Sequence, residues 1–184
     1  EFRRVLFRSE ECFSLIRNKN NKKLEKEIKE TLVNYDNIEL LIYNSLTFSS
    51  QKYGPLIQNI VKSFVLGNKV SQLDKKGDIK KNNIFYEIKT GMSFRVVQFR
   101  HEHNYDYDLF VFIDGIDFHF EIYLIKHKDL TSFVLKNKIG SFSHNQNGNE
   151  LAFGLKECFA LNEYLQNFRI KDFKQLYDII GNIN

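Results

Sequence analysis

The chain has little of several residue types, and each shortage excludes a class of protein. Two Cys, Cys12 and Cys158, are too few for a disulfide scaffold and favour a reducing, cytoplasmic location. One Pro and nine Gly in 184 residues exclude collagen-like and linker-rich chains. No run of about eighteen apolar residues occurs, so the sequence predicts no membrane-spanning helix and no membrane partner.

Apolar residues, in contrast, are plentiful. Hydrophobic residues make up 42% of the chain and aromatic residues 15%, with 18 Phe and 9 Tyr. This content is enough to bury a core, and it argues against intrinsic disorder. The length suits one domain better than two. The formal charge of +4 permits a polyanionic partner without requiring one.

The first nine residues, Glu1–Ser9, differ in composition from the rest. They hold three of the seven Arg, whereas the other 175 residues hold four Arg and 20 Lys. Their back-translation resembles a common short-read sequencing adapter, so we interpret them as assembly read-through, with a natural basic arm as the alternative. Residues 10–184 then carry a formal charge of +2, lack the true N-terminus and are predicted to form a single domain.

Residues 10–70 are predicted to be helical. A first helix over Lys22–Asn34 has an apolar residue at every fourth position. Asp36 is expected to cap a second helix. A third is expected to begin near Pro55 and to end near Gly67, because Pro suits a first helical turn and Gly suits a helix end.

The apolar period then changes to two, which predicts a sheet core over about 71–130. Asp78–Lys81 and Ile84–Thr90 are expected to form a hairpin around the two-residue turn at 82–83. Leu109–Ile113 is a continuous apolar run, which is typical of a strand buried on both faces.

The remaining segments are less regular. The connector 91–106 fits a helix or a strand, and residues 118–124 alternate as a strand does. Residues 131–184 are predicted to form a C-terminal loop and helices, with a polar loop at 141–150 and a closing helix after residue 172. Helices before and after a mixed sheet make this an α/β domain.

The tripeptide Glu-Ile-Lys occurs twice, at 27–29 and at 87–89. With 13 Glu and 20 Lys in the chain, about 1.4 Glu-x-Lys patterns are expected by chance, so the context decides. The first copy lies on a predicted helix, where residues i and i+2 do not face each other. The second lies on a predicted strand, where Glu87 and Lys89 share a face.

The predicted hairpin adds a third charged group to this face. A two-residue loop at Asn82-Asn83 places Asp78 opposite Glu87, and directly opposed carboxylates about 5 Å apart repel each other. A divalent cation bound by both would offset the repulsion, and hard oxygen ligands suit Mg²⁺. Lys89 would then orient a water molecule or stabilise negative charge. The alternative is an exposed hairpin whose charges are solvated.

Gly77-Asp78, a short turn and Tyr86-Glu87-Ile88-Lys89 resemble the catalytic motif of the PD-(D/E)xK nucleases, in particular type II restriction endonucleases. Two segments extend the resemblance to about residues 50–130. Lys52–Gln58 is similar to the entry of the family's first helix, and Phe94–His101 is similar to a glutamine–arginine segment of many restriction enzymes. The family's Pro before the Asp is Gly77 here, and its first-helix acid falls near the uncharged Gln58.

The resemblance implies a restriction-endonuclease-like core, in which a mixed sheet is flanked by helices on both sides. It implies Mg²⁺-dependent hydrolysis of phosphodiester bonds in double-stranded DNA. Asp78 and Glu87 would be the catalytic metal ligands, assisted by the backbone carbonyl of Ile88, and Lys89 the water-activating group. Restriction at palindromic sites would imply a homodimer and a cognate DNA methyltransferase as the genetic partner.

Other polar residues are candidates for DNA contact. Gln98, Arg100 and His101 are the residues assigned to it, because Gln suits adenine and Arg suits guanine or phosphate. Ordinary polar positions beside a sheet are the alternative for these residues. Several lysines surround the predicted carboxylate pair and would attract phosphates: Lys75, Lys76, Lys80 and Lys81.

Two other pairs are assigned no catalytic role. His101 and His103 have no further ligands at zinc-like spacing, and Asp106 and Asp108 are expected to cap and edge the next strand. Two further interpretations of function remain open. One is a DNA repair or recombination nuclease of the same fold, and the other is a non-catalytic nucleic-acid-binding domain whose carboxylates bind no metal.

Overall fold

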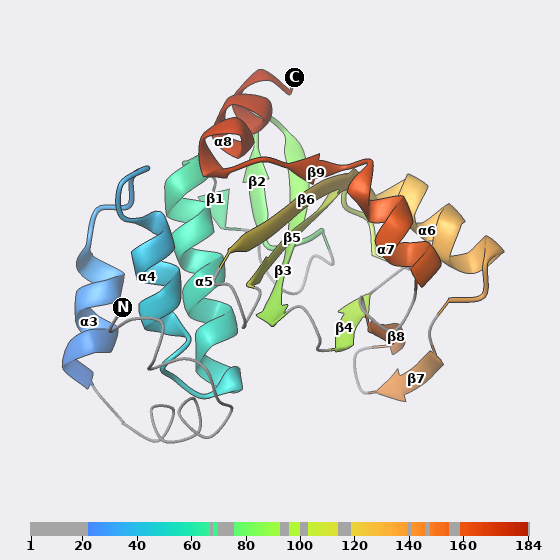
Figure 1. Cartoon of the computed structure of the whole chain (residues 1–184), viewed down its shortest axis with the longest axis horizontal. Coiled ribbons are helices and arrows are strands. Elements are labelled where there is room, and N and C mark those ends of the chain that lie inside the picture. Colours follow the sequence, from blue (N-terminus) through green and yellow to red (C-terminus); the bar gives the residue numbers. More distant parts are fainter. Residues whose placement is uncertain are drawn as a thin grey trace.

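A mixed β-sheet runs through the middle of the molecule, between two groups of helices (Figure 1). The computed structural model describes residues 22–66, 68–69, 76–92, 96–99, 103–113, 119–139, 141–145, 148–154 and 159–183. The helices in these ranges are α3 (Lys22–Glu30), α4 (Ile38–Ser45), α5 (Ser50–Val65), α6 (His127–Lys136), α7 (Phe159–Gln166) and α8 (Phe173–Asn182). The strands are β1 (Asn68–Lys69), β2 (Ile79–Lys81), β3 (Ile84–Met92), β4 (Val96–Phe99), β5 (Tyr107–Ile113), β6 (Phe120–Lys126), β7 (Ser141–Asn145), β8 (Gly148–Gly154) and β9 (Arg169–Ile170).

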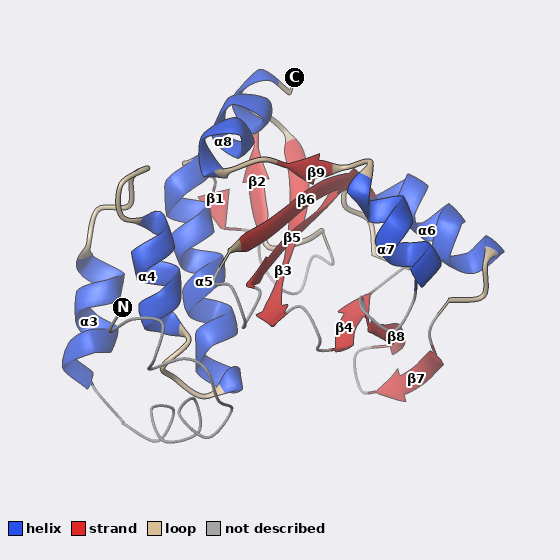
Figure 2. Cartoon of the chain, viewed as in Figure 1, coloured by secondary structure: helices blue, strands red, loops and turns tan. Residues whose placement is uncertain are grey.

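The larger sheet has six strands within the described residues, in the order β1-β2-β3-β5-β6-β9. Strands β3 and β5 run parallel, and every other neighbouring pair is antiparallel. Figure 2 shows this sheet with α3, α4, α5 and α8 on one side and α6 and α7 on the other. The sheet is therefore mixed and is covered by helices on both faces.

Two apolar clusters pack on opposite faces of β5. Leu109, Val111 and Ile113 belong to the cluster that includes α4, α5 and α8, whereas Phe110 and Phe112 belong to the cluster with α6 and α7. All five side chains are fully buried. Because successive side chains of a strand point to opposite faces, both faces of β5 must be covered. This confirms the predicted α/β class and the predicted buried strand.

The first two predicted helices are present with different ends. Helix α3 stops at Glu30, four residues before the predicted end at Asn34. Helix α4 has Asn37 at its N-cap, so the predicted cap at Asp36 is wrong. The reason is a turn centred on Asn34, whose side-chain oxygen accepts hydrogen bonds from the backbone N–H groups of Asp36 and Asn37 at 3.0 and 3.2 Å.

Helix α5 begins earlier than the sequence predicts. Ser49 is its N-cap, so Pro55 lies inside the helix rather than in its first turn. Because proline has no backbone N–H, this 16-residue helix lacks one hydrogen-bond donor at Pro55 and continues past it. Its C-cap is Leu66, which has a left-handed φ of 56°, and Gly67 lies outside the described residues.

The structure contains a second sheet of three strands, in the order β4-β8-β7, which the sequence does not predict. The polar loop predicted at 141–150 is wrong, because β7 and β8 pair there as an antiparallel hairpin. The ambiguous connector 91–106 contains β4, so the strand alternative holds at Val96–Phe99. The C-terminal region, predicted as a loop and helices, therefore also contains strands β7, β8 and β9. The closing helix is confirmed as α8.

The hairpin of β2 and β3 has the register that a two-residue loop predicts, because Ile79 pairs with Tyr86. The loop residues Asn82 and Asn83 have φ values of 50° and 62°. These left-handed values are those of a type I′ hairpin turn, and Asn adopts them at lower cost than most residues.

Gly77 leads the chain into β2 with a backbone conformation that few residues adopt. Its φ is 91°, and a Cβ atom at this position would lie 2.7 Å from the carbonyl oxygen of Tyr86. Proline cannot replace it, because the proline ring holds φ near −65°. A proline at this position would therefore require a different backbone conformation.

We predict that Gly77→Ala lowers the free energy of unfolding by about 2 kcal/mol, because the variant combines a strained φ with a steric clash. Gly181→Ala is the matched control. It lies in α8 with no atom within 4 Å of the added Cβ, so it is expected to stabilise the protein by up to about 1 kcal/mol. Urea denaturation of both variants measures the two changes. Equal stability of the two variants would contradict the prediction.

Candidate active site

Asp78 lies one residue before β2 and binds to the backbone of β3. Its N–H donates to the carbonyl of Tyr86 at 2.8 Å, and its Oδ2 accepts a hydrogen bond from the N–H of Ile88, also at 2.8 Å. The β2–β3 ladder ends at Ile79 and Tyr86, so the predicted pairing of Asp78 with Glu87 across the hairpin is wrong. The Asp78 carboxylate therefore occupies the place beside β3 where a longer β2 would have provided a backbone carbonyl.

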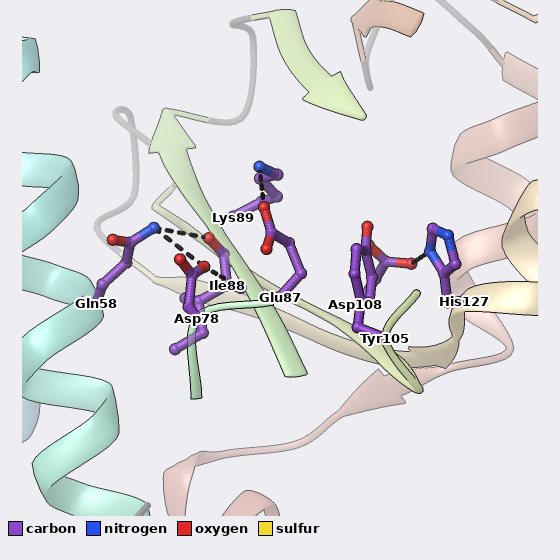
Figure 3. Close-up of polar contacts among 8 residues, drawn as sticks. All are labelled: Gln58, Asp78, Glu87, Ile88, Lys89, Tyr105, Asp108 and His127. Carbon is purple, nitrogen blue, oxygen red and sulfur yellow. Dashed lines mark hydrogen bonds and ion pairs between the residues drawn. The ribbon is translucent and has the colours of Figure 1, made fainter. Parts of the chain in front are cut away.

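Gln58 joins this group from α5. Its Nε2 lies 3.2 Å from Asp78 Oδ2 and 3.2 Å from the carbonyl oxygen of Ile88. Figure 3 shows the Gln58 side chain pointing at both oxygens. The resemblance placed the family's first-helix acid near Gln58, and the structure brings this residue into contact with Asp78.

Glu87 and Lys89 form an ion pair on the face of β3 opposite to Ile88. Lys89 Nζ lies 2.5 Å from Glu87 Oε1, and their side chains are 17% and 7% exposed. The prediction that these two residues share a strand face is confirmed. Removing both charges from water is costly, and the short hydrogen bond between them offsets part of that cost.

A buried polar cluster that the sequence interpretation missed lies one strand away. Asp108 is opposite Glu87 in the parallel β3–β5 ladder and is fully buried. Its Oδ1 accepts a hydrogen bond from the hydroxyl of Tyr105 at 2.8 Å, and its Oδ2 lies 2.9 Å from Nδ1 of His127. We refer to Tyr105, Asp108 and His127 as the buried triad.

The sequence assigned Asp108 to the edge of a strand, and this is wrong because Asp108 lies inside β5. One signal was available. Asp108 directly precedes the apolar run Leu109–Ile113, and a charged residue entering a strand buried on both faces requires hydrogen-bond partners. Asp106 does occupy an edge role, because its carboxylate accepts a hydrogen bond from the N–H of Phe85 at 2.8 Å.

The pKa values of two members of the buried triad, Asp108 and Tyr105, are raised above their ordinary values. Burial raises the pKa of Asp108, and the hydrogen bonds from His127 and Tyr105 offset part of this increase. Burial also raises the pKa of Tyr105, and the negative charges of Asp108 and Glu87 raise it further. Tyr105 therefore remains a protonated hydrogen-bond donor across the range in which proteins are stable.

The resemblance assigns three oxygen-bearing groups to a metal: the carboxylates of Asp78 and Glu87 and the backbone carbonyl of Ile88. Two carboxylates and a backbone carbonyl are the hard donors that Mg²⁺ prefers. Asp78 Oδ2 and the Ile88 carbonyl already converge on one hydrogen-bond donor, Gln58 Nε2, so both oxygens face a common point. Asp78 and the Ile88 carbonyl fit the cation in type and in direction, and the Glu87 carboxylate, which is paired with Lys89, fits it in type. No group of three or more His, Cys, Asp or Glu side chains in the described part of the chain is arranged as a metal site.

Of the candidate DNA-contact residues Gln98, Arg100 and His101, only Gln98 lies within the described ranges. Gln98 lies in β4 of the smaller sheet, paired with Ala152 of β8. Arg100 and His101 lie outside the described residues, as does Lys75. His103 lies close to the buried triad, with its ring 6.5 Å from that of Tyr105.

Neither protein-family models nor curated proteins match the chain. In the described ranges, no helix has the length and apolar character needed to cross a bilayer. What the site does must therefore be inferred from its own chemistry.

We predict different effects for two substitutions of Asp78. Asp78→Ala leaves the N–H of Ile88 without its acceptor and is expected to cost about 1–3 kcal/mol of unfolding free energy. Asp78→Asn keeps an oxygen acceptor and is expected to cost less than about 1 kcal/mol. Urea denaturation distinguishes them, and equal losses would show that the hydrogen bond to Ile88 contributes little.

We also predict a pH dependence that originates at Asp108. Its pKa is raised in the folded state, so the unfolded chain releases this proton first as the pH rises above 3.8. The stability from Asp108 is thus fully present below that pH and is lost as the pH rises through the folded-state pKa. Asp108→Asn should become more stable relative to the native protein over this rise.

Urea denaturation of both proteins from about pH 4 to about pH 7 measures the change. The matched control is Asp129→Asn, at an exposed carboxylate of α6. A stability difference between Asp108→Asn and native protein that is constant with pH would contradict the prediction.

Proposed function

We propose that this protein is a Mg²⁺-dependent endonuclease that hydrolyses phosphodiester bonds of double-stranded DNA, with the core of a type II restriction endonuclease. One observation carries the proposal. A nearly buried Glu87 is paired with Lys89 at 2.5 Å, and the residue between them holds the Asp78 carboxylate through its backbone N–H. Two acids and a lysine are thereby fixed to three consecutive residues of one strand.

The roles follow from the chemistry of each group. Asp78, Glu87 and the carbonyl of Ile88 would bind Mg²⁺, which supplies charge to polarise a phosphoryl oxygen and to acidify a bound water. Lys89 carries an ammonium group that orients this water or stabilises negative charge at the phosphorus. Gln58 has both an amide N–H₂ and an amide oxygen, so a half-turn of its amide presents an acceptor in place of a donor.

A non-catalytic nucleic-acid-binding domain is the second candidate, and one observation favours it. Gln58 Nε2 already satisfies Asp78 and Ile88 without a cation. In this case Asp78 and Gln58 would serve only to complete the edge of β3. A repair or recombination nuclease would use the same residues as the restriction enzyme and differs in its DNA substrate.

The decisive experiment is incubation of native protein and Lys89→Ala with plasmid DNA and Mg²⁺. Native protein is expected to give discrete bands, and chelation of the metal should abolish them. Lys89→Ala should cleave at least about 100-fold more slowly, which is the usual effect of losing one charge-stabilising group.

The chain offers a matched control in its other Glu-Ile-Lys copy. Lys29→Ala, in the exposed Lys29–Glu25 pair of α3, changes the same residue type in the same tripeptide and should cleave as native protein does. Absence of cleavage by folded native protein, or equal cleavage rates for native protein and Lys89→Ala, would contradict the catalytic proposal.

A further inference from the structure

Phe85, Glu87 and Lys89 lie on one face of β3, because side chains two residues apart in a strand point the same way. Lys80 pairs with Phe85 across the hairpin, so it lies on this face too. The face is that of α6 and α7, but the cluster beneath these helices takes its strand residues from β5 and β6. Lys80 and Phe85 are only half-buried.

Two lysines hold their ammonium groups over the Phe85 ring. Lys80 Nζ lies 5.3 Å from the ring centroid and Lys76 Nζ lies 5.6 Å from it. A cation over an aromatic face is held there by the ring quadrupole, and it keeps its full charge. We call Lys76, Lys80 and Phe85 the lysine–phenylalanine patch.

Lys76 and Lys80 differ from the four lysines of the described structure that pair with a glutamate. Lys26, Lys29, Lys52 and Lys89 each lie within 4 Å of a glutamate oxygen. Neither Lys76 nor Lys80 forms an ion pair with any carboxylate of the described residues. Two positive charges therefore lie over one ring with no carboxylate of the described residues paired to them, which is an arrangement suited to an external anion.

We propose that this patch binds the backbone phosphates of DNA next to the phosphate that the Glu87–Lys89 site would cleave. The inference rests on the proposed function, because it places the patch on the same strand face as that site. Phe85 and Glu87 are about 7 Å apart along β3. This separation places the patch beside the phosphate that would be bound at the Glu87–Lys89 site.

Salt-dependent binding tests the proposal without requiring cleavage. Fluorescence anisotropy of a labelled DNA duplex is measured in chelator across a series of KCl concentrations. Each lost phosphate contact makes the slope of log K against log[KCl] less negative by about 0.9. Lys76→Gln/Lys80→Gln is therefore expected to make the slope less negative by about 1.8 and to weaken binding at every salt concentration.

Lys171→Gln/Lys174→Gln is the matched control. It removes the same charge from two exposed lysines beside and within α8, on the opposite face of the sheet, and should leave the slope at the native value. Phe85→Leu keeps both charges but loses the ring, so it should keep the native slope while binding about two- to fivefold more weakly. Circular dichroism confirms that each variant is folded.

Several outcomes would overturn the proposal. One is a slope in Lys76→Gln/Lys80→Gln equal to that of native protein, and another is an equal change of slope in the Lys171→Gln/Lys174→Gln control. The others are the absence of duplex binding by native protein and competition by polyglutamate that equals competition by DNA at matched charge. Cleavage of DNA by native protein, together with an unchanged slope in Lys76→Gln/Lys80→Gln, would overturn the proposal for the patch and leave the nuclease proposal standing. A less negative slope in Lys76→Gln/Lys80→Gln, found with a native protein that cuts no DNA, would support the patch and refute the nuclease.

Discussion

The backbone of Ile88 is the point on which the site depends. It lies in a strand that continues beyond the end of its antiparallel partner, because the β2–β3 ladder stops at Ile79 and Tyr86. A buried N–H or carbonyl without a partner costs free energy comparable to a lost hydrogen bond. Asp78 accepts from the N–H, and Gln58 donates to the carbonyl. The need to satisfy the Ile88 backbone therefore brings α5 and the Gly77 turn into contact with β3.

The same requirement gives Asp78 two possible tasks. A carboxylate that caps a strand edge is oriented by the fold, and a catalytic carboxylate also needs a fixed orientation. An asparagine would meet the structural need almost as well, since it also offers an oxygen to Ile88. A negative charge at this position is therefore more than the fold requires, and that surplus favours a role for Asp78 in binding a cation.

The sequence predicted those parts of the structure that depend on local patterns. The register around Asn82-Asn83 followed from turn chemistry, and the shared face of Glu87 and Lys89 followed from strand periodicity. The small sheet was missed because its hairpin at 141–150 is polar and shows no apolar alternation. The buried triad was missed because it is assembled from β5, the segment before it and the start of α6, which only tertiary packing brings together.

Charge balance links the buried triad to the proposed reaction. Glu87 and Asp108 are neighbours in the β3–β5 ladder, and two nearly buried carboxylates at adjacent positions repel each other unless each has donors of its own. Asp108 takes its donors from Tyr105 and His127, so Lys89 is left to Glu87. Lys89 would leave Glu87 for a water or a phosphate only when another cation took its place. In the proposed nuclease, a cation held by Glu87 would therefore replace the charge of Lys89 and would leave the Lys89 ammonium group available to a water or a phosphate.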